Sequence, residues 1–183
     1  MAYRNKLLKN KATGQDIRFL QTAADTDGEL LEMESTYHSR STEPPMHYHP
    51  NQDEEFTVLA GALTVRMNGQ IRILHKGEVF LVARNTSHAM WNDSADKTIV
   101  NWKVKPALDS ECFFETIYGL ADDGKANKKG IPSLLQMSLT ANRFSSVFRL
   151  SKPGLMIQKI VFGILTPIAL LRGNKAVYKK YID

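Results

Sequence analysis

The sequence predicts a mainly β chain in which a double-sheet barrel is followed by a helical extension. Between Gly14 and Lys105, short runs rich in β-branched and aromatic residues follow one another at close spacing, separated by glycine and asparagine turns, as in double-sheet barrels. After Pro106 the apolar residues recur at helical spacing. A length of 183 residues suits one well-filled core with an appendage. We therefore expect a barrel over residues 1–105 and a helical extension over residues 106–183 that packs on the barrel or on a dimer partner.

The expected strands follow from apolar runs and from the turns between them. Asp25-Thr26-Asp27-Gly28 has the residues of a tight turn, and Asn68-Gly69 is the strongest hairpin signal in the chain. The segment just before that hairpin alternates cleanly between apolar and polar side chains. The predicted strands are residues 15–22, 29–36, 56–59, 63–67, 71–74, 79–82, 89–91 and 98–104.

The extension contains three segments with helical or apolar patterns. Residues 112–120 carry apolar side chains at helical spacing. Residues 134–148 predict a second helix or a pair of helices, because the proline and serine at 132–133 are typical of a helix start. The Lys-Pro-Gly sequence at 152–154 ends this segment, and a largely apolar run, residues 155–171, follows it.

Two separated segments contain side chains suited to a metal ion. His47 and His49 lie two residues apart on an extended segment and therefore point to the same side. Glu54 follows a Pro-Asn turn that allows the chain to bring a carboxylate to the same place. The second segment supplies His88, which can reach the others because inward-facing positions of a closed barrel converge. Three nitrogens and one oxygen suit a divalent transition metal with positions left open for water or substrate.

These segments resemble the paired motifs of the cupin family. The first motif, H-x-H, three or four residues, E, six residues, G, is met by His47, His49, Glu54 and Gly61. The second motif reads G, five residues, P-x-G, two residues, H, three residues, N. It is met by Gly77, His88 and Asn92, while Ala83 replaces the proline and Asn85 the glycine. The resemblance implies a double-stranded β-helix, or jelly-roll, barrel that binds Fe, Mn, Zn or Ni. The donor set alone does not select among these metals.

The start of the extension also resembles small bacterial proteins that join one cupin barrel to a helical C-terminal extension. The similar segments are Trp102-Lys103-Val104-Lys105-Pro106-Ala107-Leu108 and, shortly after it, Phe113-Phe114-Glu115-Thr116. This second resemblance covers nearly the whole chain. It implies the fold and the metal ligands, and it implies no substrate.

Further side chains are expected around the metal. By alternation along the strands, Phe56 faces the same way as Glu54, and Met90 and Asn92 face the same way as His88, which places them on the pocket wall. A role in the barrel core is the alternative for Phe56 and Met90. Gln52 and Asn92 are candidates to hydrogen-bond the ligands or the substrate in a second shell.

Three functions fit these observations. The first is an enzyme of dioxygenase or isomerase type, whose chemistry centres on the metal because no separate nucleophile set or phosphate-binding loop is visible. Catalytic residues beyond the ligands are not identified. The second is a non-catalytic sensor or binding module that holds a sugar or an aromatic acid beside a structural metal. The third is an interaction protein that docks through its helical tail.

Charge and cysteine content bear on partners and location. The net charge of +5 belongs to the tail, because residues 1–105 hold 13 basic and 13 acidic side chains and residues 106–183 hold 11 and 6. The single Cys112 and the lack of an apolar run after the basic N-terminus predict a cytoplasmic protein. The run 155–171 is too short to span a bilayer. Packing on the barrel or in a homodimer is preferred for it, with weak membrane-surface contact through the basic tail as the alternative. No nucleic-acid-binding module is recognisable.

Overall fold

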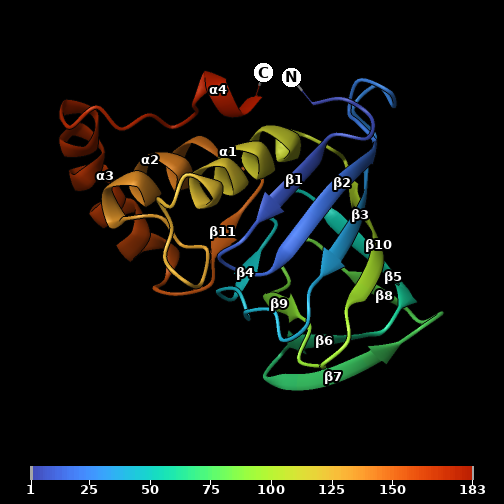
Figure 1. The fold of residues 1–183 in the computed structure, drawn as a ribbon. Coiled ribbons are helices and arrows are strands. Elements are labelled where there is room, and N and C mark those ends of the chain that lie inside the picture. The colour runs from blue at the N-terminus through green and yellow to red at the C-terminus, as the bar shows by residue number, and fades with distance from the viewer. Residues whose placement is uncertain (1, 183) are drawn as a thin grey trace.

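Two antiparallel sheets form the main body of the protein (Figure 1). The structure, a computed structural model, describes residues 2–182. The strands are β1 (Leu7–Asn10), β2 (Gln15–Gln21), β3 (Leu31–Tyr37), β4 (His47–Tyr48), β5 (Asp53–Ala60), β6 (Ala62–Met67), β7 (Gln70–His75), β8 (Val79–Val82), β9 (His88–Trp91), β10 (Thr98–Lys105) and β11 (Arg149–Leu150). One sheet has the order β1-β2-β3-β10-β5-β8 and the other β11-β4-β9-β6-β7. The predicted double-sheet barrel is confirmed.

The core lies between the sheets because the strands bury alternate side chains. Along β3 and β10 every second residue is buried, as the two-residue period of a strand requires when one of its faces is covered. Phe19, Met33 and Phe56 are among the large side chains removed from solvent in this way. The same alternation decides which side chains of the central strands point into the barrel.

In two turns the backbone has positive φ angles, which explains the residue types found there. Asn68 and Gly69 join β6 to β7 with φ angles of 52° and 77°, so the predicted hairpin is confirmed and its positive φ angles suit these two residue types. Gly61, between β5 and β6, has a φ of 77°, and a Cβ atom there would lie 2.6 Å from the carbonyl oxygen of Lys97. A side chain at position 61 would therefore collide with the backbone at the start of β10.

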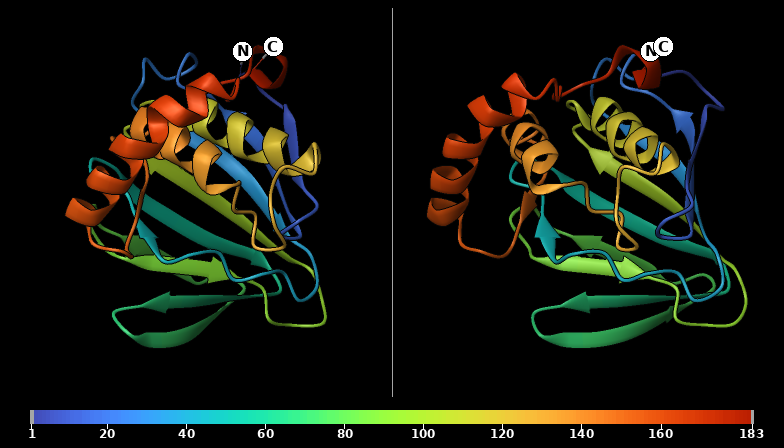
Figure 2. Two further views of the ribbon diagram at one scale, coloured as in Figure 1. Left: turned by 90° about the vertical axis from the view of Figure 1, so that its left-hand side faces the viewer. Right: turned by 60° about the vertical axis from the view of Figure 1, so that its left-hand side comes forward.

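The helices of the extension lie on one side of the barrel (Figures 1 and 2). They are α1 (Ser110–Asp122), α2 (Leu134–Arg143), α3 (Leu155–Leu171) and α4 (Lys179–Ile182). Helix α1 contacts β1 and α4, whereas α3 packs on α2. The Ser133 hydroxyl caps α2 by accepting a hydrogen bond from the backbone N–H of Gln136. None of the helices in residues 2–182 combines the length and apolar character needed to cross a bilayer.

The segment after α2 differs from the sequence prediction. The helix predicted to continue to residue 148 ends at Arg143, and the chain then forms the two-residue strand β11. Phe144 and Val147 are buried instead of continuing the helix. Strand β11 pairs with β4, placing Leu150 opposite His47. The extension therefore contributes an edge strand to the sheet that carries the histidines.

Candidate metal centre

The barrel brings three histidines from two separated segments to one place. His47 on β4 and His88 on β9 are direct partners in the antiparallel ladder, and His49 follows β4. Their ring centroids lie 4.6 Å apart for His47 and His88, 5.3 Å for His47 and His49, and 5.5 Å for His49 and His88. One ring nitrogen from each lies within 4.8 Å of the others. One ion can therefore contact all three imidazoles.

Backbone carbonyls determine which nitrogen of each histidine is free. The Nδ1 atoms lie 2.9 Å from the carbonyl oxygen of Pro45 for His47, 2.7 Å from that of Val147 for His49, and 2.9 Å from that of Thr86 for His88. A carbonyl oxygen only accepts, so each Nδ1 carries the proton and donates it. In the neutral rings the Nε2 lone pairs are left for a metal, the arrangement that orients ligating histidines in proteins.

Glu54 supplies a carboxylate beside the histidines. It approaches two of them, with Oε1 at 3.3 Å from His49 Nε2 and Oε2 at 3.0 Å from His88 Nε2. Trp102 Nε1 donates a hydrogen bond of 3.0 Å to Oε1. Despite these short distances, Glu54 Oε2 and His49 Nε2 have no correctly aligned hydrogen-bond partner among the described residues. Buried polar atoms rarely remain unpaired, so this donor set fits a cation bound between them.

The charge states of these groups suit a cation. Burial lowers the pKa of His49 and, together with repulsion by the neighbouring imidazoles, holds the pKa of His47 well below its usual value. Burial opposes ionisation of Glu54, but attraction to the histidines outweighs it and lowers the pKa of Glu54 to about 2. At neutral pH the site therefore offers His47 and His49 as neutral imidazoles and Glu54 as a carboxylate, the forms that bind metals.

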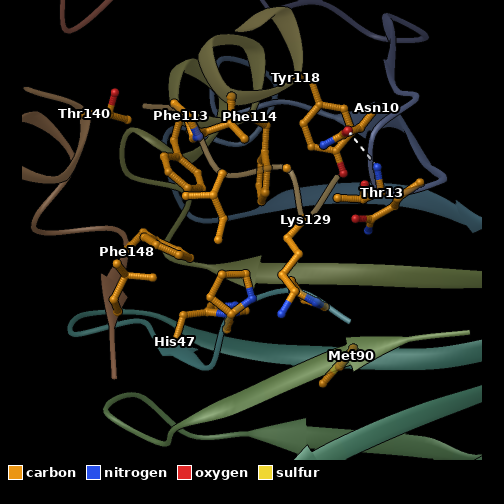
Figure 3. A pocket seen from close by; sticks show the side chains of 18 of the residues that line it. Asn10, Thr13, His47, Met90, Phe113, Phe114, Tyr118, Lys129, Thr140 and Phe148 are labelled. Carbon is orange, nitrogen blue, oxygen red and sulfur yellow. Dashed lines mark hydrogen bonds between the residues drawn. The ribbon is translucent and has the colours of Figure 1, made fainter. Parts of the chain in front are cut away.

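A cavity of about 150 Å³ adjoins the histidines (Figure 3). Its walls are largely apolar and include Phe56 and Trp102 of the barrel and Phe113, Phe114 and Phe148 of the extension. Phe148 stacks on His47 with centroids 4.8 Å apart and on Phe113 at 4.9 Å. The metal centre thus opens onto an apolar space that the extension helps to enclose.

Of the four side chains expected around the metal, two line the cavity and two donate hydrogen bonds to backbone carbonyl oxygens. Phe56 and Met90 line the cavity. Gln52 donates hydrogen bonds to the carbonyl oxygens of Pro106 and Ala107 and to the Ser110 hydroxyl, which joins β5 to the start of α1. The Asn92 amide donates instead to the carbonyl oxygens of Tyr37, His38 and Asp96. Gln52 and Asn92 thus hold backbone segments together behind the site.

Several wall residues were missed by sequence reasoning. Trp102 is opposite Phe56 in the β5–β10 ladder, so the alternation applied to Phe56 could have found it. Phe113, Phe148 and Lys129 gave no such signal, because nothing in the sequence indicates which face of the extension meets the barrel. The remaining histidines, His38 and His75, are exposed and lie outside the cluster.

A comparison with known protein families identifies the family of the barrel. Residues 33–102, which include the three histidines and Glu54, match the family model described as "Cupin domain". The barrel is a cupin domain. This agrees with the cupin motifs in the sequence and with the two-sheet architecture. The match does not include the helical extension.

Solved structures resemble the cupin barrel at low sequence identity. A predicted oxalate decarboxylase from Thermotoga maritima superposes with a TM-score of 0.50 and 16% identity, covering 58% of this chain and 99% of that chain. KdgF from Halomonas sp. gives a TM-score of 0.49 and 20% identity, covering 57% and 91%. At 16% identity, the Thermotoga maritima structure supports the fold alone.

One curated relative shares clearer sequence similarity. An oxidoreductase of Arthrobotrys oligospora is 35% identical over 89 residues, which cover 44% of this chain and 35% of the relative. This chain therefore spans about a third of the length of that protein.

Proposed function

We propose that this cupin is a metal-dependent enzyme of dioxygenase or isomerase type that acts on a small organic acid with an apolar or aromatic body. The observation that carries the proposal is the set of three Nδ1–carbonyl contacts, which leave three Nε2 atoms and the Glu54 carboxylate converging beside a cavity. His47, His49, His88 and Glu54 would hold the metal. A divalent Fe, Mn, Ni or Zn ion there would supply Lewis-acid or redox chemistry. The oxidoreductase relative favours the dioxygenase type over the isomerase type.

The chain's own residues bind and orient the substrate. The aromatic walls receive its apolar body and exclude water from the histidines. Phe148, stacked on His47, fixes the plane of that ring and forms the wall beside it. Trp102, by donating to Glu54 Oε1, keeps the carboxylate turned toward the histidines. A cavity of about 150 Å³ limits the substrate to a small molecule.

The position of Lys129 in the cavity favours a substrate that carries a carboxylate group. Apart from the histidines, it is the one cationic side chain among the described residues that line the cavity, and no Asp or Glu lines it. Its side chain extends into the cavity (Figure 3) and forms no ion pair with a described residue. The Asn127 carboxamide oxygen accepts hydrogen bonds from the backbone N–H groups of Lys129 and Ile131, which shapes the loop. An ammonium group here would pair with a substrate carboxylate.

The test is turnover by protein purified without a polyhistidine tag and loaded in turn with each metal. Oxygen uptake and carbonyl isomerisation are measured with small aromatic acids and with their methyl esters. We expect turnover with at least one metal, preference for the acids, and an increase in KM of about fivefold in Lys129→Gln with the acids but not with the esters. Equal rates with acids and esters would contradict the assigned substrate class.

A non-catalytic binding module is the second candidate. It is favoured by the scarcity of proton-transfer groups, because the titratable side chains among the described cavity-lining residues are histidines, two tyrosines and Lys129. A protein that binds aromatic acids but is inert with every metal would support this module. A bacterial origin, a cytoplasmic location and a homodimer remain predictions from the sequence.

A further inference from the structure

Helix α3 presents an apolar face to solvent. Met156 is 77% exposed, Ile164 63% and Leu171 90%. The face comprises Met156, Ile157, Ile160, Ile164, Ile168 and Leu171, most of them three or four positions apart along one side of the helix. Amphipathic surface helices normally turn the apolar side to the core. A continuous apolar face in solvent marks an interaction surface.

The opposite side of α3 is already occupied by packing. Phe162 and Ala169 are buried, and α3 contacts α2. The Gln158 amide donates hydrogen bonds to the carbonyl oxygens of Leu150 and Pro153, which fixes the first turns of the helix. Figures 1 and 2 show α3 as the outermost element, on the far side of α2 from the barrel. The exposed face is therefore held in one orientation, pointing away from the protein.

The charge around this face is of one sign. Residues 124–182 contain eleven Lys and Arg and no Asp or Glu. Lys152, Lys159 and Arg172 lie before, within and after α3, are exposed, and make no ion pair among the described residues. A second copy docked on this face would bring like charges together, whereas an anionic lipid surface would complement them.

We propose that α3 docks this protein on the surface of an anionic membrane. The helix, roughly 25 Å long from its rise per residue, lies in the plane of the interface with its apolar face among the acyl chains. The exposed lysines and arginines contact the headgroups. The barrel, on the other side of α2, stays in water.

The test is sedimentation of the full chain with vesicles. Vesicles of phosphatidylcholine alone are compared with vesicles of phosphatidylcholine and phosphatidylserine in roughly a two-to-one ratio. We expect binding to the anionic vesicles at least about tenfold stronger than to the neutral ones, weakening as salt rises. Ile160→Gln with Ile164→Gln, and separately Lys159→Gln with Arg172→Gln, should each reduce it about tenfold or more.

The matched control is Ile73→Gln on β7, because Ile73 is 58% exposed and Ile160 is 59% exposed. This control should bind vesicles like the unaltered chain, and circular dichroism should show that every variant is folded. Absence of binding at low salt, or equal binding to both vesicle types, would overturn the proposal. A lipid-free dimer that becomes monomeric in the Ile160→Gln, Ile164→Gln variant would also overturn it, because the face would then be a protein interface.

Discussion

At the scale of single residues, the metal centre depends on where each imidazole proton sits. The spacing of His47 and His49 and the barrel motif of His88 were enough to predict that the three would meet. Their hydrogen-bond acceptors were beyond sequence reasoning. Pro45 and Thr86 are near neighbours of their histidines, but Val147, which accepts from His49, lies 98 residues away in the extension. Tertiary packing alone brings that carbonyl to the site.

Removing an imidazole should remove the metal. His49→Ala and His88→Ala each delete one converging Nε2 atom, so we expect metal affinity to fall by about a hundredfold or more in both variants. His75→Ala is the control, since His75 is exposed and outside the cluster. Elemental analysis after dialysis measures the bound metal. Equal metal content in all three variants would show that these histidines are not the ligands.

Replacing the carboxylate should change the titration of His88. Burial disfavours the charged imidazole, but contact with Glu54 outweighs it and raises the pKa of His88 above 6.5. In Glu54→Gln the burial effect remains without the opposing charge, so the pKa of His88 should fall below 6.5. Metal-free His88 should therefore lose its proton at a lower pH in the variant than in the parent.

Histidine NMR titration of the metal-free protein measures this change. Glu55→Gln is the matched control, because Glu55 is adjacent in sequence but pairs with Lys103 at 2.9 Å. An unchanged His88 pKa in Glu54→Gln would mean that the carboxylate does not act on this ring.

At the scale of elements, the predicted strands omitted β1 and the two shortest strands, β4 and β11. Strands β4 and β11 have two residues each, too few to show a period-two pattern, yet their pairing places Phe148 and Val147 beside the histidines. Several longer strands and helix α1 were predicted near their observed bounds, because they carry several repeats of their pattern, and the apolar run 155–171 forms helix α3. Removal of the extension would therefore also remove the carbonyl oxygen that accepts from His49 and the ring that stacks on His47.

Alanine substitutions at two glycines test how the helices pack. A Cβ atom at Gly119 of α1 would lie 2.3 Å from the Tyr181 ring of α4, so Gly119→Ala should displace α4 and destabilise the protein. Gly163 of α3 has no neighbour within 4 Å of its Cβ position, so Gly163→Ala should stabilise the fold by about 0.5–1 kcal/mol through helix propensity. Urea unfolding gives both free energies, and hydrogen exchange should show faster opening of α4 in Gly119→Ala alone. Equal stabilisation by both substitutions would contradict the packing of Tyr181 on α1.

At the scale of the whole molecule, the barrel and its ligands were predictable but the enclosed cavity was not. Alternation and turn residues predicted a two-sheet barrel whatever follows it, and the resemblance of two segments to the cupin motifs added the family. Aromatic side chains from α1 and from the segment before β11 line the cavity. The spacing of apolar residues in the sequence does not indicate which element covers the opening of a barrel. The extension therefore shapes the cavity, while the barrel supplies the histidine cluster and Glu54.

The central claim is that one divalent ion binds between the two barrel segments. A crystal structure of the metal-loaded protein, with anomalous data collected at the absorption edge of the metal, tests it most directly. The structure predicts one strong anomalous peak bonded to Nε2 of His47, His49 and His88, with the Glu54 carboxylate as a fourth ligand. A peak elsewhere, or ligation through an Nδ1 atom, would contradict it.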